Sequence, residues 1–184
     1  MKSTTDNEIL ILFRDPAQRS NAFNLLIKKY QERLYWHIRK IVISHEDSDD
    51  VMQNTFIKIW KGLSNFRYDA QLYTWMYRIA TNEALSFLKE KQKKQLGYGG
   101  EVEEMLLKTL ESDTYFDGDA AQKDLQRAIL ELPEKQRLVF NMKYFDELKY
   151  EEMSEILETS VGALKASYHH AVKKIESFIK LQEF

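Results

Sequence analysis

Apolar residues recur three and four positions apart along much of this chain, and this spacing constrains the fold more than any other feature. One stretch shows it clearly, at Phe23, Leu26, Ile27, Tyr30, Leu34, Ile38 and Ile41. Such a repeat places the apolar side chains on one face of an α-helix. The 184 residues include only two prolines and six glycines, so long helices are permitted and a turn-rich all-β fold is disfavoured. The sequence therefore predicts an all-α protein.

Two further helices are expected in the first half of the chain. Ser48, Asp49 and Asp50 supply an N-cap and acidic first-turn residues for one of them, because carboxylates favour the positive end of a helix dipole. Its apolar residues are Val51, Met52, Phe56, Ile59, Trp60 and Leu63. A loop is predicted at residues 64–71, and residues 73–94 follow as one continuous helix without proline or glycine. The inward face of that helix is expected at Leu72, Met76, Ile79, Ala80 and Phe87.

An acidic segment separates two helical units. Residues 96–120 hold seven carboxylates and one cation, Lys108, for a net charge of −6. Three glycines in LGYGGE break the helical pattern, and the weak periodicity after them predicts flexibility. We therefore predict two small helical domains, residues 1–95 and 120–184, joined by an acidic flexible linker at residues 96–119. In the second domain, Pro133 suits the first residue of a helix.

Residues 150–175, YEEMSEILETSVGALKASYHHAVKKI, are typical of a helix-turn-helix. The small residue Ser154 lies where the second helix must cross the first, and the hydroxyl of Ser160 can cap the second helix. Glu158 occupies a turn position that favours glycine because φ is positive there, and a non-glycine residue costs roughly 1 kcal/mol. Core positions are expected at Met153, Leu157, Leu164 and Tyr168.

The outward face of the second helix of this motif carries small and basic side chains. They are Ala163, Lys165, Ala166, Ser167, His169, His170, Lys173 and Lys174. Small side chains allow a helix to enter the DNA major groove, and polar ones reach base edges or phosphates. A helical hairpin with a solvated lysine face would show the same periodicity and is the alternative interpretation.

A polar stripe follows the predicted helix at residues 73–94, at Trp75, Arg78, Asn82, Ser86, Lys89 and Lys93. Cations can follow phosphates, an amide can contact a base edge, and a ring can stack on a base for about 1–3 kcal/mol. The preceding loop adds Phe66, Arg67 and Tyr68. We interpret the stripe as a surface for single-stranded nucleic acid. The alternative is that Trp75 belongs to the core and the lysines only keep the helix soluble.

No catalytic or cofactor-binding pattern is evident. The chain has no cysteine, which excludes disulfides and thiol chemistry and fits a reducing compartment. Helix capping explains the carboxylates of EDSDD, and the adjacent His169 and His170 point about 100° apart on a helix, so no metal site is expected. EILILF is too short for a signal peptide, and no apolar run approaches the ~20 residues of a membrane helix. We expect a cytoplasmic protein that is not an enzyme and needs no cofactor.

Five segments together resemble the extracytoplasmic-function (ECF) group of bacterial RNA polymerase sigma factors, in the family's order and spacing. They are RDPAQRSNAFNLLIKKY, DSDDVMQNTFIKIW, FRYDAQLYTWMYRIATNEALSFL, LPEKQRLVFNMKYF and YEEMSEILETSVGALKASYHHAVKKI, and they span nearly the full length. The resemblance implies that the two domains are sigma regions 2 and 4. It also implies a protein that binds core RNA polymerase and directs transcription from specific promoters.

The resemblance further implies roles for single positions. Contacts to the clamp helices of the largest polymerase subunit would come from Asp50, Gln53, Asn54, Phe56 and Trp60. The −10 element would be captured and read by Phe66, Arg67, Tyr68, Gln71 and Asn82, with Trp75, Arg78, Lys89 and Lys93 beside them. The −35 element would be read by residues 163–170, near which Lys173 and Lys174 would meet phosphate. Ser167 and Ala163 depart from the arginine and threonine common in the family, so the −35 sequence is not copied from a relative.

Further partners are implied by the same resemblance. The second domain would meet the flap of the second-largest polymerase subunit, and the acidic linker would thread toward the active site. An anti-sigma factor, often membrane-anchored in this group, is also expected. Two rival functions explain part of the sequence. A regulator that binds duplex DNA without polymerase would not need residues 50–60 or the aromatic stripe, and a protein-binding helical adaptor would not need the basic recognition helix.

Overall fold

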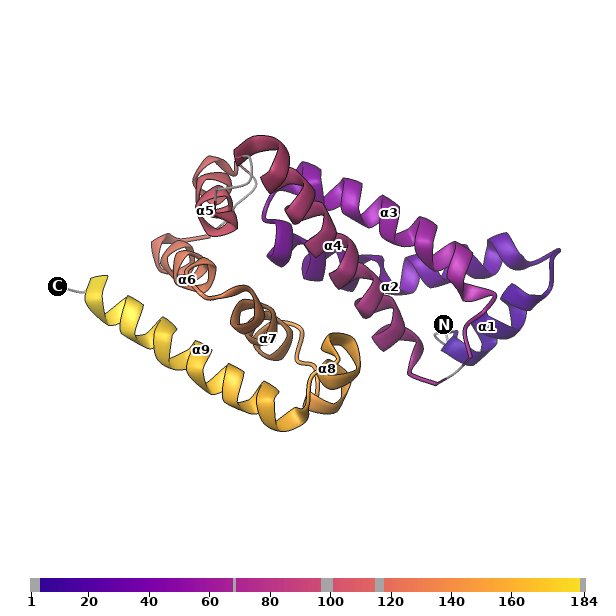
Figure 1. Ribbon diagram of the computed structural model, residues 1–184. Coiled ribbons are helices and arrows are strands. Elements are labelled where there is room, and N and C mark those ends of the chain that lie inside the picture. The colour runs from indigo at the N-terminus through magenta and orange to yellow at the C-terminus, as the bar shows by residue number, and fades with distance from the viewer. Residues whose placement is uncertain (1–3, 68, 97–100, 115–117, 183–184) are drawn as a thin grey trace.

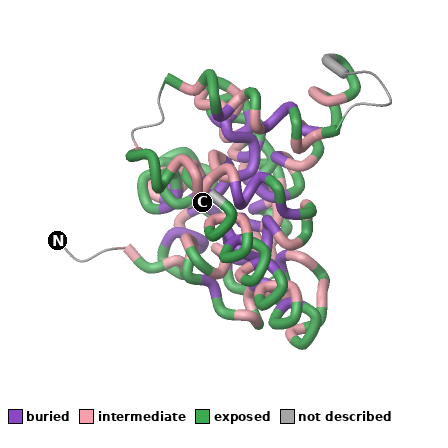
Figure 2. The backbone as a smooth tube through the Cα atoms, turned by 90° about the vertical axis from the view of Figure 1, so that its left-hand side faces the viewer, coloured by how far each residue is buried: buried purple, intermediate pink, exposed green. Residues whose placement is uncertain are grey.

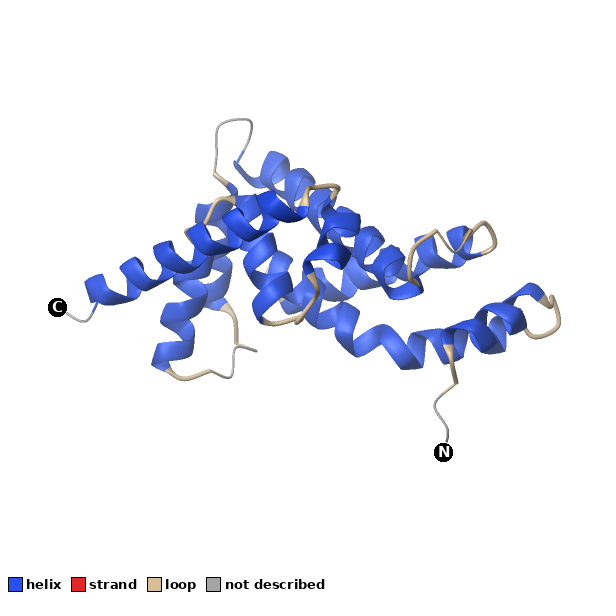
Figure 3. Ribbon diagram, turned by 90° about the horizontal axis from the view of Figure 1, so that it is seen from below, coloured by secondary structure: helices blue, strands red, loops and turns tan. Residues whose placement is uncertain are grey.

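The computed structural model describes residues 4–67, 69–96, 101–114 and 118–182. These residues form nine helices and no strand. Figure 3 shows helices joined by loops, and the prediction of an all-α protein is confirmed. In chain order (Figure 1) the helices are α1 (Asp6–Arg14), α2 (Arg19–Val42), α3 (His45–Leu63), α4 (Leu72–Leu96), α5 (Val102–Ser112), α6 (Ala120–Leu130), α7 (Glu134–Tyr144), α8 (Tyr150–Leu157) and α9 (Val161–Gln182). Within the described residues, none of these helices combines the length and apolar character needed to cross a bilayer.

Helices α1 to α4 form a first bundle around α2, which packs against the other three. The apolar repeat of α2 turns Leu26, Leu34 and Ile38 fully inward, as predicted. On α4 the buried face runs through Leu72, Met76, Ala80, Ala84 and Leu88. Ile79 and Phe87 were predicted to share this face, but they lie at its edge and are only half-buried.

The start of α3 differs from the capping prediction. Ser44, not Ser48, is the N-cap, and its Oγ accepts a hydrogen bond from the amide of Asp47 at 3.2 Å. Ser48 lies one turn inside the helix, where its hydroxyl is buried and donates to the carbonyl of Ser44 at 2.6 Å. Several serine and aspartate residues follow one another here, and each carries the same capping signal. The sequence therefore located the cap but not its register.

The prediction of a flexible linker is wrong for Val102–Ser112, which form α5. Met105, Leu106 and Leu110 stand on one face of this helix and are buried. The helix packs against α4 and α6, so it joins the two halves of the molecule as a structured element. Asp113 follows directly and pairs with Arg39 of α2. High acidic content concealed a short amphipathic pattern in this segment.

Helices α6 to α9 form a second bundle, in which α9 packs against α6, α7 and α8. The predicted helix-turn-helix is present in α8 and α9. Glu158 has a left-handed backbone with φ 51°, and Ser160 Oγ accepts from the amide of Ala163 at 3.3 Å, so both turn predictions are confirmed. Met153 and Leu164 are buried as expected, whereas Leu157 and Tyr168 are half-buried beside the buried Ile156. Pro133 is the N-cap residue of α7, one position before the predicted place.

The second bundle lies directly against the first. α8 packs on α4, and α7 packs on α2. Apolar residues of both bundles, such as Leu34 and Met142, belong to one continuous core cluster. Figure 2 shows the buried segments continuing through the middle of the molecule. The relative placement of α4 and α8 decides which of the predicted site residues are accessible.

Candidate nucleic-acid interface

One face of α3 is open to solvent and carries three of the five positions that the resemblance assigns to polymerase binding. These are Asp50, Gln53 and Asn54. Phe56 and Trp60 are half-buried instead. The ring of Trp60 meets Phe13 and Phe23 nearly edge to face, with ring centroids 5.3 and 4.9 Å apart. Phe56 packs in the same way against Phe23, at 6.1 Å. The two aromatic residues therefore support the face from behind rather than project from it.

Ile57 is a residue of this face that the sequence reasoning missed. Its side chain is 45% exposed. It stands three positions after Asn54 and four after Gln53, which places it on the same side of the helix. A large apolar side chain surrounded by polar groups is a typical protein-interface anchor. The helical spacing alone could have identified it.

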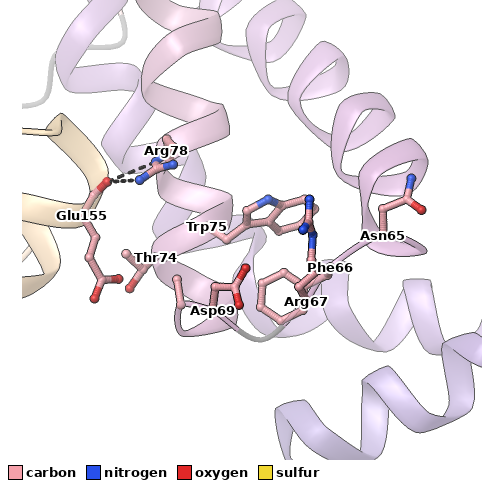
Figure 4. Close-up of a pocket in the computed structure, with 9 residues that line it drawn as sticks. Asn65, Phe66, Arg67, Asp69, Thr74, Trp75, Arg78 and Glu155 are labelled. Atoms are coloured by element: carbon pink, nitrogen blue, oxygen red, sulfur yellow. Dashed lines mark hydrogen bonds between the residues drawn. The ribbon is translucent and has the colours of Figure 1, made fainter.

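The loop before α4 and the first turns of α4 enclose a cavity of about 350 Å³ (Figure 4). The rings of Phe66 and Trp75 lie against each other with centroids 5.3 Å apart and form an aromatic wall. Arg67 and Asp69 add charged groups around the same space. Thr74 also lines it, and its buried Oγ1 has no hydrogen-bond partner among the described residues. Phe66, Arg67 and Trp75 are thus brought together as expected.

The other predicted residues near this cavity have different environments. Gln71 is exposed one turn before Trp75. Tyr68 lies outside the described residues. Farther along α4, exposed positions include Asn82, Ser86, Lys89 and Lys93. After the first two turns of α4, the polar stripe predicted from the sequence therefore lies on one solvent-accessible side of the helix.

Arg78 of the same stripe is bound to residues of the second bundle. Its Nε donates to the main-chain carbonyl of Glu155 at 3.1 Å, and its Nη2 donates to the same oxygen. Its Nη1 lies 3.5 Å from a carboxylate oxygen of Glu158. One turn earlier, the Tyr73 hydroxyl donates to the carboxylate of Glu152. Residues at and after α8 therefore cover the first two turns of the stripe.

The predicted recognition residues lie on α9 and are mostly exposed. Ala163, Lys165, Ala166, His169, His170, Lys173 and Lys174 face solvent, whereas Ser167 is half-buried. The ammonium of Lys165 lies over the ring of Tyr150, 5.7 Å from its centroid. Lys173 and Lys174 are about two turns beyond Ser167. This arrangement gives α9 a small-residue start and a basic end.

A second cavity, of about 420 Å³, lies between the two bundles. Asn82 and Arg78 line it from α4, and Ala163 and Ser167 line it from α9. Glu158 closes it from the turn between α8 and α9. Residues predicted to read the −10 element and residues predicted to read the −35 element therefore face one shared space.

Comparison with known proteins identifies the family. The profile described as Sigma-70 region 2 matches residues 26–94, and that of Sigma-70, region 4 matches residues 122–175. The RNA polymerase sigma-H factor of Pseudomonas aeruginosa is 31% identical over 175 residues, which cover 86% of both chains. The ECF RNA polymerase sigma-E factor of Escherichia coli K12 is 29% identical over 169 residues, 86% of this chain and 87% of that one. The chain belongs to the ECF group of the sigma-70 family.

As an ECF sigma factor, the protein recognises promoters and directs transcription initiation with RNA polymerase. Sigma factors are initiation factors, and RNA synthesis belongs to the polymerase. The region 2 match covers most of α2, all of α3 and most of α4. The region 4 match covers the helix-turn-helix. Both candidate surfaces therefore lie within the matched segments.

Two solved structures share the fold of this sigma factor. CnrH in complex with the cytosolic domain of CnrY gives a TM-score of 0.69 at 19% identity, covering 96% of this chain and 99% of that one. The sigma factor RpoE in complex with the anti-sigma factor NepR, from Bartonella quintana, also gives 0.69, at 18% identity over 86% and 96% of the two chains. These alignments extend over both bundles.

Proposed function

We propose that this sigma factor divides promoter recognition between residues 1–95 and residues 120–184, with α3 docked on core polymerase. The support is the exposed face that carries Asp50, Gln53, Asn54 and Ile57. Its polar groups surround one apolar side chain, the composition of a protein-binding hot spot. The clamp helices of the largest polymerase subunit are the proposed partner of this face.

The cavity before α4 is the single observation that carries the DNA-melting part of the proposal. It has an aromatic wall of Phe66 and Trp75 and a guanidinium, Arg67, at its edge. A flipped base of the −10 strand can stack on such a wall while the cation meets its phosphate. Because these groups bind only an unpaired base, they shift the duplex–bubble equilibrium toward the open state. Asn82 lies two turns after Trp75 and would contact a neighbouring base edge.

The start of α9 would read the −35 duplex. Ala163 and Ala166 are small enough for close approach to the floor of a major groove. Ser167, Lys165 and the two histidines would contact base edges or phosphates, and Lys173 and Lys174 would follow the phosphate strand. Region 4 would also meet the flap of the second-largest polymerase subunit.

We further propose that this sigma factor is cytoplasmic and that an anti-sigma factor binds it there. That partner would carry a membrane anchor, as many anti-sigma factors of this group do. RpoE of B. quintana was solved with the anti-sigma factor NepR, and CnrH was solved with the cytosolic domain of CnrY. These complexes support the proposal because the fold is shared over most of the chain.

In vitro transcription on a genomic fragment library tests the proposal. Core polymerase is supplied with the full chain, and start sites are compared with those from core polymerase alone. We expect new start sites that share one −10 and one −35 sequence. The same library is then transcribed with Trp75→Ala, which should lose these starts while the chain stays bound to core. If the wild-type chain adds no start site, the proposed division of promoter recognition is wrong.

A further inference from the structure

We propose that this sigma factor binds a small, uncharged, planar aromatic molecule in a cavity between α2, α5, α6 and α7. The cavity has a volume of about 750 Å³, within the range of about 300–1,000 Å³ that is typical of small-molecule sites. It shares no lining residue with the two cavities described above. The inference therefore goes beyond the proposed function and does not depend on it.

Two pairs of aromatic rings line this cavity. Tyr35 and Trp36, in the second half of α2, meet nearly edge to face with centroids 5.4 Å apart. Tyr144 and Phe145, at the end of α7, meet in the same way at 4.9 Å. Trp36 and Tyr144 are 53% and 54% exposed, and no other Phe, Tyr or Trp of the described residues is as open to solvent. Large open rings beside a cavity can stack on a planar aromatic ligand.

The backbone is strained at one residue of the lining, Ile43, which follows α2. Its φ is 67° and its ψ is −43°, and the amide of Ser44 donates to the carbonyl of Val42 at 2.8 Å. This is a γ-turn with positive φ, a rare and strained geometry that β-branched residues seldom adopt. Strained backbone is retained most often at functional sites such as ligand-binding clamps. Its position therefore supports a binding role for the cavity.

The cations of the lining are paired with carboxylates. Arg39 of α2 pairs with Asp113, which also lines the cavity. Nζ of Lys40 lies 2.6 Å from the carboxylate of Asp146. A charged ligand would lose its hydration in the cavity without gaining a counter-ion, and burying such a charge is costly. The electrostatics of the lining therefore favour an uncharged ligand.

A few uncharged polar groups can orient the ligand. Gln126 of α6 is half-buried in the lining, and its amide can both donate and accept a hydrogen bond. The hydroxyl of Tyr35 shares a hydrogen bond of 2.5 Å with Nδ1 of His45. Aromatic walls with a small number of polar groups are the usual composition of a small-molecule site. Because α2 belongs to the first bundle and α6 and α7 to the second, the bound molecule would contact both.

The indole N–H signals of the isotope-labelled full chain test the site by NMR. The chain has 3 tryptophans, Trp36, Trp60 and Trp75, and Trp36→Phe assigns the signal of Trp36. The probes are indole, quinoline and lumichrome, each compared with a carboxylate derivative of the same ring system. We expect at least one uncharged probe to shift the Trp36 signal alone, and its carboxylate derivative to bind several-fold more weakly. If no probe shifts the Trp36 signal at millimolar concentration, the proposal is wrong.

Trp36→Ala removes one ring from the wall of the cavity. Isothermal titration calorimetry with the tightest probe should show a roughly 5- to 150-fold loss of affinity, as for one base stacked on an aromatic side chain. Trp36→Phe keeps a ring and should retain most of the affinity. Ile11→Ala, a truncation at an exposed site on α1, is the control and should bind like wild type. Thermal unfolding first establishes that each variant is folded, and Tyr144→Ala carries the measurement if Trp36→Ala is not.

Three results would overturn the proposal. Wild-type affinity in both Trp36→Ala and Tyr144→Ala would place the probe outside this cavity. Carboxylate derivatives that bind as tightly as the uncharged probes would contradict the ligand class. A dimer of the free chain in sedimentation velocity, abolished by Trp36→Ala, would mean that a second copy covers the rings. All these measurements use the free chain, so their failure leaves the proposed function to be decided by the start sites alone.

Discussion

Gly62 of α3 lies directly against the indole of Trp75 of α4. A Cβ placed on Gly62 would stand 2.9 Å from Cζ2 of Trp75, closer than real side-chain contacts allow. The missing side chain thus lets the indole lie against the backbone of α3. Because that ring forms the wall of the cavity with Phe66, the helix proposed to dock on polymerase also sets the position of the proposed base-binding wall.

Gly62→Ala is expected to impair promoter opening. The added methyl group must displace the Trp75 ring, which weakens stacking worth about 1–3 kcal/mol per base. Open-complex formation should fall roughly 5- to 150-fold at constant holoenzyme concentration. Permanganate reactivity of thymines in the bubble measures this fall, and retention of the −35 duplex should be unchanged.

Gly162→Ala is the matched control for that substitution. A Cβ at Gly162 meets no atom within 4 Å, and alanine in place of glycine in a helix adds up to about 1 kcal/mol of stability. Thermal unfolding should therefore show Gly162→Ala equal to or above wild type. Undiminished permanganate reactivity for Gly62→Ala would mean that this contact does not position the cavity wall.

Ile57→Ala should weaken polymerase binding about 10-fold without destabilising the chain. Ile57 is exposed on the α3 face, so truncation removes an interface anchor worth at least ~1 kcal/mol and no core packing. Competition binding to core polymerase gives the affinity, and urea unfolding of the free chain gives the stability. Ile11→Ala, the same truncation at a 64% exposed site on α1, should change neither.

Trp60→Ala should show in the same two assays how loss of packing behind the α3 face affects stability. Its ring packs against Phe13 and Phe23, so Trp60→Ala should lower the free energy of unfolding by about 2–4 kcal/mol. Any loss of polymerase affinity in this variant would then combine the two effects. Equal polymerase affinities of Ile57→Ala and wild type would remove Ile57 from the proposed interface.

Asn82→Ala should impair promoter opening more than duplex binding. Asn82 is exposed on α4 and would meet a base edge only after the strands separate. Loss of one base contact corresponds to about 1–3 kcal/mol of discrimination. Transcription from a premelted and a fully duplex template compares the two steps with one holoenzyme. Equal losses on both templates would contradict a role in the separated strand.

Lys173→Ala should weaken DNA binding equally for all sequences. Lys173 is exposed on the basic end of α9, and a lysine that neutralises one phosphate adds about 1 to the slope of log affinity against log salt. Affinity of the holoenzyme for a −35 duplex, measured across salt concentrations, gives the slope. An unchanged slope would show that Lys173 does not touch phosphate.

The sequence predicted the helices well because apolar spacing survives any arrangement of the bundles. The sequence also predicted that Phe66, Arg67 and Trp75 lie close together, since they are neighbours along the chain around one loop. α5 was missed because its five buried or half-buried apolar positions are outweighed by acidic residues on its other sides. The register of the α3 cap was missed because Ser44 and Ser48 carry equal signals.

The packing of α8 on α4 could not be predicted from periodicity. Arg78, Tyr73 and Glu152 are polar residues on outward helix faces, and their pattern is the same whether they meet water or another helix. His37 and Asp146 are 109 positions apart, and neither carries a local signal for the other. Contacts of this kind depend on the tertiary arrangement, which also determines which site residues are accessible.

Asp146, two residues after the end of α7, accepts hydrogen bonds from Nδ1 of His37 at 2.8 Å and from Nζ of Lys40 at 2.6 Å. This buried contact predicts a pH dependence of stability. Burial acts to raise the pKa of the Asp146 carboxyl, but the hydrogen bonds and charges of His37 and Lys40 outweigh it and hold that pKa below its ordinary value of 3.8. Tyr77 of α4 also interacts with this carboxyl, and burial raises the pKa of its phenol to about 12, so it stays neutral in the acid range. A depressed carboxyl pKa stabilises the folded state above the unfolded pKa, and this stability is lost as the pH falls through the folded pKa.

Wild type should therefore exceed Asp146→Asn in free energy of unfolding by about 3 kcal/mol above about pH 5. The difference should shrink as the pH falls below the ordinary value of 3.8, because the protonated carboxyl no longer offers a charge to His37 and Lys40. Urea unfolding followed by circular dichroism from about pH 3 to 7 measures both chains. Asp124→Asn is the matched control, because it removes the same charge from an exposed pair with Arg127 on α6. It should stay within ~0.5 kcal/mol of wild type throughout. A difference between wild type and Asp146→Asn that stays constant down to the lowest pH would show that the charge of Asp146 does not stabilise the joined bundles.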